Sequence, residues 1–213
     1  MKKIILIISL IAINFFPAHT QSIIRFGAGG GFNISIYPSQ FSVDLPLAAF
    51  IEYSPSIDSY FKYCLKQGYI SSSTPKNSGK YSEGTTKHLF TGLEASYLLD
   101  SHVNFNIGAG INYNYFSREL SSEAAKIFSD RGLDGKESFE RGFGLELFFN
   151  FEPFKTKKSP ISLMLEGTGN MVFTNFRTSV TDKSTGKSSE KSSDLKIYYF
   201  NVIIYLIFDF SKI

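Results

Sequence analysis

Apolar and polar residues alternate with a period of two along most of the chain after its first 20 residues. The clearest segment runs from Val103 to Tyr115, where Val, Phe, Ile, Ala and Tyr alternate with Asn and Gly. In Phe139–Phe151, Phe and Leu likewise occupy alternate positions, interrupted only by Arg141. Alternate side chains of a strand point to opposite faces, whereas a helix would mix the two sets. Both segments are therefore predicted to be strands with one apolar face.

Further segments have the same character, although the last of them is apolar on both faces. They are Ile24–Asn33, Asp44–Tyr53, Tyr60–Ile70, His88–Tyr97, Ile161–Thr174 and Lys196–Phe210. The pattern thus predicts eight strands in all. Most are close in length to the ~9–11 tilted residues with which a strand crosses an outer membrane.

Short and long connections alternate between these segments. The short ones are Ser54–Ser59, Leu98–Ser101 and Glu152–Pro160, and the long polar ones are Ile34–Val43, Ser71–Lys87, Phe116–Lys136 and Asn175–Asp194. Membrane barrels have short periplasmic turns and longer extracellular loops, so this asymmetry favours such a barrel. Within the long connections, Ser122–Phe128 is predicted to form a short surface helix and Thr178–Asp194 a mobile loop.

The apolar face of an eight-stranded barrel can lie inside, as in soluble lipocalin-like barrels, or outside against lipid. Here the polar face is mainly Gly, Asn and Ser with single charges, which suits a lumen just wide enough for side chains. Aromatic residues gather at the predicted strand ends, as interfacial girdles do. They are Tyr53, Phe61, Tyr97, Phe149 and Phe151 near the short connections, and Tyr69, Tyr113, Tyr115, Phe139 and Phe173 near the long ones.

We therefore predict an all-β fold, an eight-stranded antiparallel up-and-down transmembrane β-barrel with short periplasmic turns and longer extracellular loops. The predicted lipid-facing residues are Val103, Phe105, Ile107, Ile111, Leu145 and Leu147. A soluble periplasmic lipocalin-like ligand-binding barrel is the alternative, and it would place these residues inside.

Residues 1–20 have the pattern of a secretory signal peptide. Lys2 and Lys3 precede the apolar stretch Ile4–Phe16, and Ala18 and Thr20 are small residues before a cleavage site. The expected domains are thus a signal peptide at 1–20 and a barrel domain at 21–213, in the cell outer membrane. Cleavage would leave 20 basic and 19 acidic residues, a net charge of +1. A nucleic-acid partner is not expected at this charge, because nucleic-acid binders carry a large basic excess.

Charged residues on the predicted inner faces suggest a lumen charge network. Its expected members are Arg25, Glu52, Lys62, Lys66, Glu94, Glu140, Glu146 and Glu166. Pairing the strands across their short connections sets Glu52 opposite Lys62, and Glu146 opposite Glu166. Two carboxylates so placed would repel unless a cation reaches them or one is protonated. Lys62 or Lys66 is the expected cation, which predicts a plugged lumen; a metal or proton site at the two glutamates is the alternative.

Candidate catalytic groups are few. His88 and His102 are the histidines that follow the predicted cleavage site, and Cys64 is the single cysteine of the chain. His88 lies near the serines of the Ser71–Lys87 connection, so a Ser–His pair of a lipid A-modifying enzyme is conceivable. An unpaired thiol in an exported protein is more often buried than reactive. We expect a non-catalytic protein with no metal and no cofactor, and keep the lipid A-modifying enzyme as an alternative.

The whole pattern resembles the small outer-membrane barrels of the OmpA/OmpX type. The mature start at Gln21 and the glycines of the first strand, Gly27, Gly29, Gly30 and Gly31, resemble more specifically the PorT-like barrels of Bacteroidota. The chain departs from proteobacterial barrels in ending Phe210-Ser211-Lys212-Ile213, without a terminal aromatic residue. The resemblance implies a structural, surface-interaction or secretion/uptake accessory role. The implied partners are outer-membrane lipid, lipopolysaccharide and a protein of an envelope assembly.

Overall fold

The strands of the chain form a single antiparallel sheet. The computed structural model describes residues 22–37, 40–56, 59–74, 82–154 and 159–212, and within them the sheet has ten strands. The elements are β1 (Ile23–Tyr37), β2 (Gln40–Asp44), β3 (Leu47–Ser54), β4 (Phe61–Thr74), β5 (Gly84–Asp100), β6 (Phe105–Leu120), α2 (Ser122–Asp130), β7 (Leu133–Phe139), β8 (Gly142–Phe151), β9 (Ile161–Asp182), β10 (Ser188–Asp209) and a 3-10 turn, η1 (Phe210–Lys212). The predicted signal peptide lies outside the described residues.

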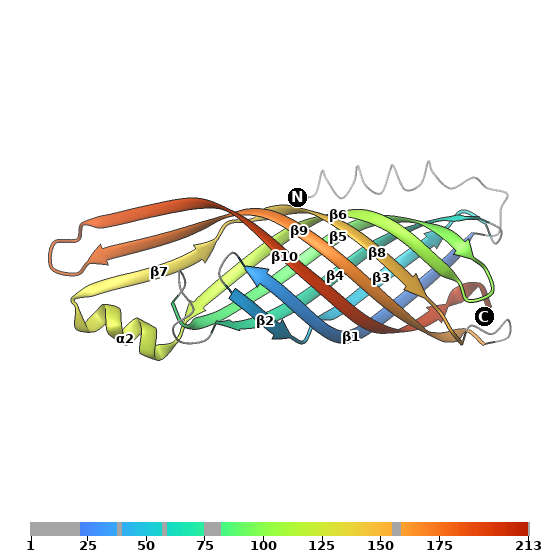
Figure 1. The fold of residues 1–213 in the computed structure, drawn as a ribbon, viewed down its shortest axis with the longest axis horizontal. Coiled ribbons are helices and arrows are strands. Elements are labelled where there is room, and N and C mark those ends of the chain that lie inside the picture. Colours follow the sequence, from blue (N-terminus) through green and yellow to red (C-terminus); the bar gives the residue numbers. More distant parts are fainter. Residues whose placement is uncertain (1–21, 38–39, 57–58, 75–81, 155–158, 213) are drawn as a thin grey trace.

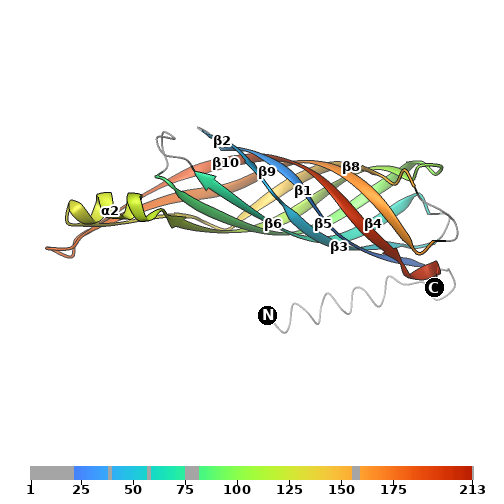
Figure 2. The same ribbon diagram turned by 90° about the horizontal axis from the view of Figure 1, so that it is seen from below.

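The sheet closes on itself as a barrel, which confirms the predicted eight-stranded fold. The ring runs β1-β3-β4-β5-β6-β8-β9-β10 and is closed by antiparallel pairing of β10 with β1. The two remaining strands stand outside the ring, with β2 forming a hairpin on β1 and β7 pairing with β9. Figures 1 and 2 show the strands tilted around the barrel, with β9, β10, β7 and α2 continuing well beyond one end.

This extension replaces what the sequence predicts to be a mobile loop. β9 and β10 are 22 residues each and stay paired from Phe208↔Ile161 to Ser188↔Thr181, so residues 178–194 are mostly strand. β7 adds a third strand along β9. The short helix is confirmed as α2, whose first turn is capped by the Ser121 hydroxyl accepting from the backbone N–H of Ala124 at 3.1 Å. The structured sheet and helix beyond the barrel are called the extension below.

The seam between the first and last strands explains part of the glycine-rich sequence of β1. A Cβ atom at Gly29 would meet the backbone carbonyl oxygen of Ile204, and one at Gly31 would meet that of Val202, both closer than van der Waals contact. Only glycine permits so close an approach of two backbones. These two glycines therefore allow β1 and β10 to close the barrel.

The alternation in the sequence separates the wall into two faces as predicted. In β8, for instance, Leu145 and Leu147 are exposed on the outside, whereas Glu146 and Phe148 are buried inside. Two details differ from the prediction. Val103 lies in the turn that precedes β6, outside the strand. Phe139 is buried rather than part of an outer girdle, because the chain leaves the sheet between β7 and β8 and the alternation restarts at Gly142.

The lumen is filled by alternating apolar and polar layers, which the sequence prediction of a mostly small and ionic interior misses. Near the end opposite the extension, one apolar cluster contains Ala48, Phe50, Met164, Ile203, Tyr205 and Ile207. Toward the extension, a second one contains Ile70, Phe90, Phe116, Phe139, Val172, Phe176, Ile197 and Tyr199. Large rings fit in so narrow a barrel because they lie over glycines, as Phe50 does over Gly27 and Phe90 over Gly68.

Candidate functional site

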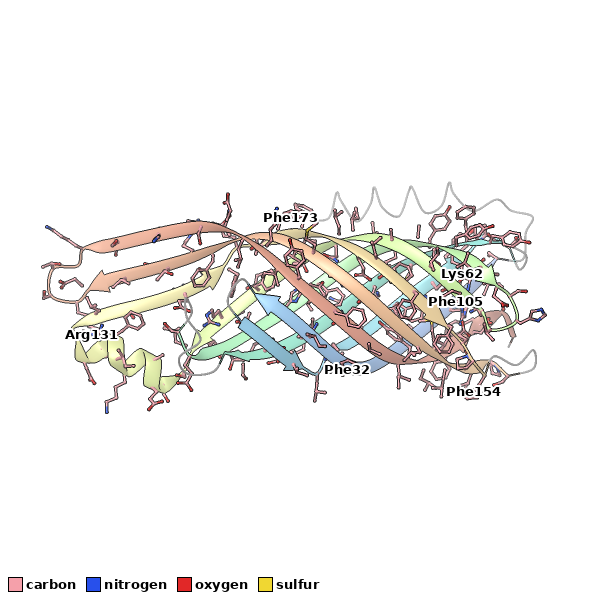
Figure 3. All side chains as sticks on the ribbon, viewed as in Figure 1. Phe32, Lys62, Phe105, Arg131, Phe154 and Phe173 are labelled. Carbon is pink, nitrogen blue, oxygen red and sulfur yellow. The ribbon has the colours of Figure 1, made fainter. Side chains whose placement is uncertain are left out.

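The lumen holds two buried charge clusters, and the lower one lies at the end opposite the extension. Arg25 donates from Nη1 to Glu52 Oε1 at 2.7 Å and from Nη2 to Glu152. Lys62, labelled in Figure 3 at this end, donates to Asn104 Oδ1 at 2.7 Å and has its Nζ 4.0 Å from Glu52 Oε1. All of these side chains are buried. Two cations and two carboxylates thus compensate one another.

The central cluster is built around Lys66. Its ammonium contacts Glu94, and its Nζ lies 2.7 Å from Glu146 Oε1 and 2.9 Å from Glu166 Oε1. The Lys66 side chain is 2 % exposed, and the ring of Phe148 lies 5.4 Å from its ammonium. A single buried cation therefore bridges carboxylates from β5, β8 and β9 and ties four strands of the ring together.

Lys66 occupies the place where a metal ion would have to sit. Its ammonium is within ion-pair distance of every carboxylate of the cluster. Across the described ranges, no group of His, Cys, Asp and Glu side chains has an arrangement suited to hold a metal ion. The cluster as it stands performs structural chemistry, since a desolvated charge is tolerated only beside charges of the opposite sign.

The strand registers differ from those predicted, although the residues that meet are largely the predicted ones. Glu52 is opposite Cys64 instead of Lys62, and Glu146 is opposite Asn170 instead of Glu166. The offset arises because the sequence prediction assumes tight hairpins, whereas the actual connections shift the pairing by two and four residues. Long side chains reach over these shifts, so Lys66 still joins Glu146 to Glu166.

Glu140 does not belong to the lumen network, which corrects the prediction. It lies between β7 and β8, half-exposed, where it accepts from Asn175 Nδ2 at 3.0 Å and pairs with Arg177. These two partners, Asn175 first, hold the pKa of Glu140 below its usual value. The chain leaves the sheet at this point, so the period-two count that assigned Glu140 to the inner face does not apply.

Glu152 is the main lumen residue that sequence reasoning misses. Its side chain is fully buried and accepts from Arg25, from Asn104 and from the hydroxyl of Ser162 at 2.9 Å. The sequence prediction places Glu152 in a short periplasmic connection. The alternation Glu146, Phe148, Asn150, Glu152 was the signal that could have assigned it to the inner face.

A layer of asparagines lies next to the central cluster on the side of the extension. Asn112 donates to Asn170 Oδ1 at 2.8 Å, and Asn114 donates to Asn112 Oδ1 at 2.6 Å. On the opposite wall Asn33 donates to Asn201 Oδ1 at 2.6 Å. Amides both donate and accept, so they can satisfy one another in a dry interior. This layer continues the closure of the lumen.

The mouth beneath the extension is closed by a further ion pair. Arg118 donates from Nε to Glu137 Oε2 at 2.8 Å and from Nη1 to Thr86 Oγ1 at 2.9 Å. Glu137 also accepts from the hydroxyl of Ser82 at 2.7 Å. Since Glu137 belongs to β7, this cluster fastens the base of the extension to the barrel.

The candidate catalytic residues occupy unrelated places. His88 is buried against Phe116, with ring centroids 4.4 Å apart, and its Nε2 lies 2.7 Å from Asn114 Oδ1. Ser71 points to the outside of the barrel, away from His88. His102 is exposed in the turn before β6, and Cys64 is a half-buried free thiol beside the lower apolar cluster. The described residues do not bring these groups together.

The outer wall of the barrel is a belt of exposed apolar side chains. Of the predicted outward residues, Ile107, Ile111, Leu145 and Leu147 are 46–70 % exposed, Phe105 is half-exposed and Val103 is exposed in its turn. Aromatic rings border the belt at both ends, including Phe61 and Tyr97 at one end and Tyr113 and Tyr115 at the other. Apolar outside and charged inside is the reverse of a soluble ligand-binding barrel. No helix of the described chain is both long and apolar enough to cross a membrane.

No family model matches the sequence, and a search of curated proteins finds no match. Several solved structures are similar. With the outer membrane protein OprG from Pseudomonas aeruginosa the TM-score is 0.56 at 13% identity, over 89% of this chain and 99% of that one. With Neisserial surface protein A the TM-score is 0.57 at 10% identity, over 89% and 97%. With a major outer membrane protein from Thermus thermophilus it is 0.56 at 14% identity, over 88% and 99%.

The chain shares their fold. At these identities the likeness concerns the fold alone, and it covers the ring and most of the extension. The charge clusters, the asparagine layer and the apolar plug are therefore the features from which a function for this chain has to be argued.

Proposed function

We propose that this chain is an integral outer-membrane barrel whose sealed lumen is structural, and whose extension makes contacts at the cell surface. The observation that carries the proposal is the distribution of side chains. The outer wall is an apolar belt bordered by aromatic rings, and the buried charges of the lumen pair with one another. Such a surface is stable in a bilayer and would aggregate in water.

The sealed lumen supports a non-catalytic and non-conducting role. Paired charges, an asparagine layer and the aromatic plug follow one another along the barrel axis. A stack of this kind fastens strands together and leaves little room for a solute. The same stack occupies the positions that a nucleophile and its base would need in the lumen.

The extension supports a role in surface contact. It is a three-stranded sheet with a helix, projecting from the barrel in Figures 1 and 2, and its base is fixed by Arg118 and Glu137. Rigid projections suit recognition, because less conformational entropy is lost on binding than for a mobile loop. The glycine-rich first strand and the expected signal peptide are in keeping with the PorT-like barrels of Bacteroidota, which adds a secretion or uptake accessory role by analogy.

The proposal is tested by fractionation and electrophysiology. The native protein should remain in outer membranes after carbonate washing, and should migrate faster on gels before heating than after. In planar bilayers, its conductance should not exceed that of a buffer control. Release by carbonate would overturn membrane insertion, whereas steady conductance would overturn the sealed lumen alone.

A further inference from the structure

Two hollows lie one above the other on the outer wall formed by β8, β9 and β10. The upper hollow, of about 610 Å³, is lined by Arg141, Phe173, Asn175, Asp194 and Lys196, together with Thr174 and Leu195. It lies where the hairpin of β9 and β10 leaves the barrel, next to the position of Phe173 in Figure 3. The lower hollow, of about 680 Å³, is centred in the apolar belt.

The upper hollow is flanked by two cations that rest on aromatic rings. The guanidinium of Arg141 lies 5.6 Å from the ring centre of Tyr115, and the ammonium of Lys196 lies 5.7 Å from that of Phe173. Arg141 and Lys196 stand on strands separated only by β9, about 10 Å apart at two strand spacings. Both side chains are long enough to meet an anion over the hollow, at the level of the girdle.

The lower hollow is almost wholly apolar. Its floor is β9 at Gly169, where a Cβ atom would meet no other atom within 4 Å. Leu147 of β8 and Phe200 of β10 stand on either side as the paired neighbours of Gly169. These flanking side chains protrude, so the hollow admits a flexible chain more readily than the flat wall of another barrel.

The two hollows are in line along the same strands. On β10, Lys196 precedes Phe200 by four residues, which is about 13 Å along a strand. An anionic group at the membrane surface and an apolar chain leading down into the bilayer would fill both at once. That combination is the chemistry of a phosphorylated lipid.

We propose that this wall binds a phosphate-bearing lipid of the outer leaflet, with its phosphate between Arg141 and Lys196 and an acyl chain over Gly169. The inference rests on the proposed membrane location and adds to it a defined ligand class. Asp194 also lines the upper hollow, pairing with Asn175 one step farther out than the pair of Lys196 and Phe173. Its carboxylate opposes the phosphate, so its removal should tighten binding.

The test is native mass spectrometry of the purified full-length protein, titrated in detergent micelles with diphosphoryl lipid A. Dephosphorylated lipid A and inorganic phosphate are the comparison probes. Arg141→Gln and Lys196→Gln should each weaken binding of the diphosphoryl lipid by about fivefold, the value of one cation near an anionic surface. Gly169→Phe should weaken it by filling the lower hollow. Asp194→Asn should strengthen it, and Lys187→Gln, in the turn at the far tip of the hairpin, should leave it unchanged.

Equal binding of the phosphorylated and dephosphorylated lipids would overturn the inference, as would a loss for Lys187→Gln equal to that for Lys196→Gln. Displacement of the lipid by inorganic phosphate at similar concentration would show a simple anion site and would also overturn it. Each variant is first checked for faster migration before heating, which separates misfolding from lost binding. Failure of the lipid test in a protein that resists carbonate extraction leaves the proposed function intact.

Discussion

The Nζ of Lys66 lies 2.7 Å from Glu146 Oε1, across a lumen in which both side chains are almost completely buried. Lys66 is on β4 and Glu146 on β8, which are not neighbours in the ring. Two further carboxylates, from Glu94 and Glu166, meet the same ammonium. The stability of the barrel should therefore depend far more on the one cation than on any single carboxylate.

Replacing Lys66 by Met should lower the free energy of unfolding by about 3–5 kcal/mol, because buried carboxylates would be left without a cation. Glu94→Gln should leave stability unchanged or raise it, since one ammonium would then face two carboxylates instead of three. Urea unfolding in lipid vesicles measures both. Equal losses for the two variants would contradict the asymmetry.

The closure seam predicts opposite outcomes for one substitution at two glycines. Gly31→Ala should cost about 1–3 kcal/mol, the usual penalty for overpacking, because the new methyl group meets the Val202 carbonyl oxygen. Gly169→Ala projects into open space and should change stability by less than about 0.5 kcal/mol. The unfolding midpoints of the two variants provide the measurement. Similar midpoints would show that β1 and β10 do not approach as described.

An arginine in the middle of the apolar belt should oppose membrane insertion. Leu147→Arg is expected to cost about 2–4 kcal/mol, as cations at the midplane of a barrel wall do. Ile127→Arg places the same side chain on exposed α2 and serves as the control. The fraction of refolded protein in vesicles should fall for the first variant and not for the second. A soluble barrel would give the opposite result, with Leu147→Arg improving solubility.

The tip of the extension should be dispensable for the barrel. Replacing residues 179–191 by Asn-Gly removes exposed β-ladder and leaves Arg118 and Glu137 in place. The shortened protein should migrate like the wild type before and after heating. Capture of surface partners from native membranes should be lost with it. A barrel that no longer refolds would show that the tip is structural.

The sequence predicts the faces of the strands far better than their register. Alternation assigns Lys66, Glu146 and Glu166 to the inside, because the side-chain period of a strand is two. Register depends on turn geometry and shear, which the alternation does not contain, so Glu52 is predicted opposite Lys62 and lies opposite Cys64.

The remaining errors fall where the chain leaves the barrel ring. The chain leaves the sheet between Phe139 and Gly142, which turns Phe139 inward and Glu140 outward. The hairpin beyond Phe176 is rich in Ser, Thr and Lys, and its composition is that of a loop. It forms strands because it pairs with itself and with β7, a long-range contact that local composition does not reveal.

Spin labels on the wall test the central assignment of outside and inside most directly. Single cysteines at positions 111, 147 and 187 are labelled in a Cys64→Ser background and reconstituted into vesicles. Power saturation should show labels 111 and 147 accessible to oxygen and shielded from a water-soluble nickel complex, with label 187 the reverse. Nickel access at 111 and 147 equal to that at 187 would contradict an apolar wall that faces lipid.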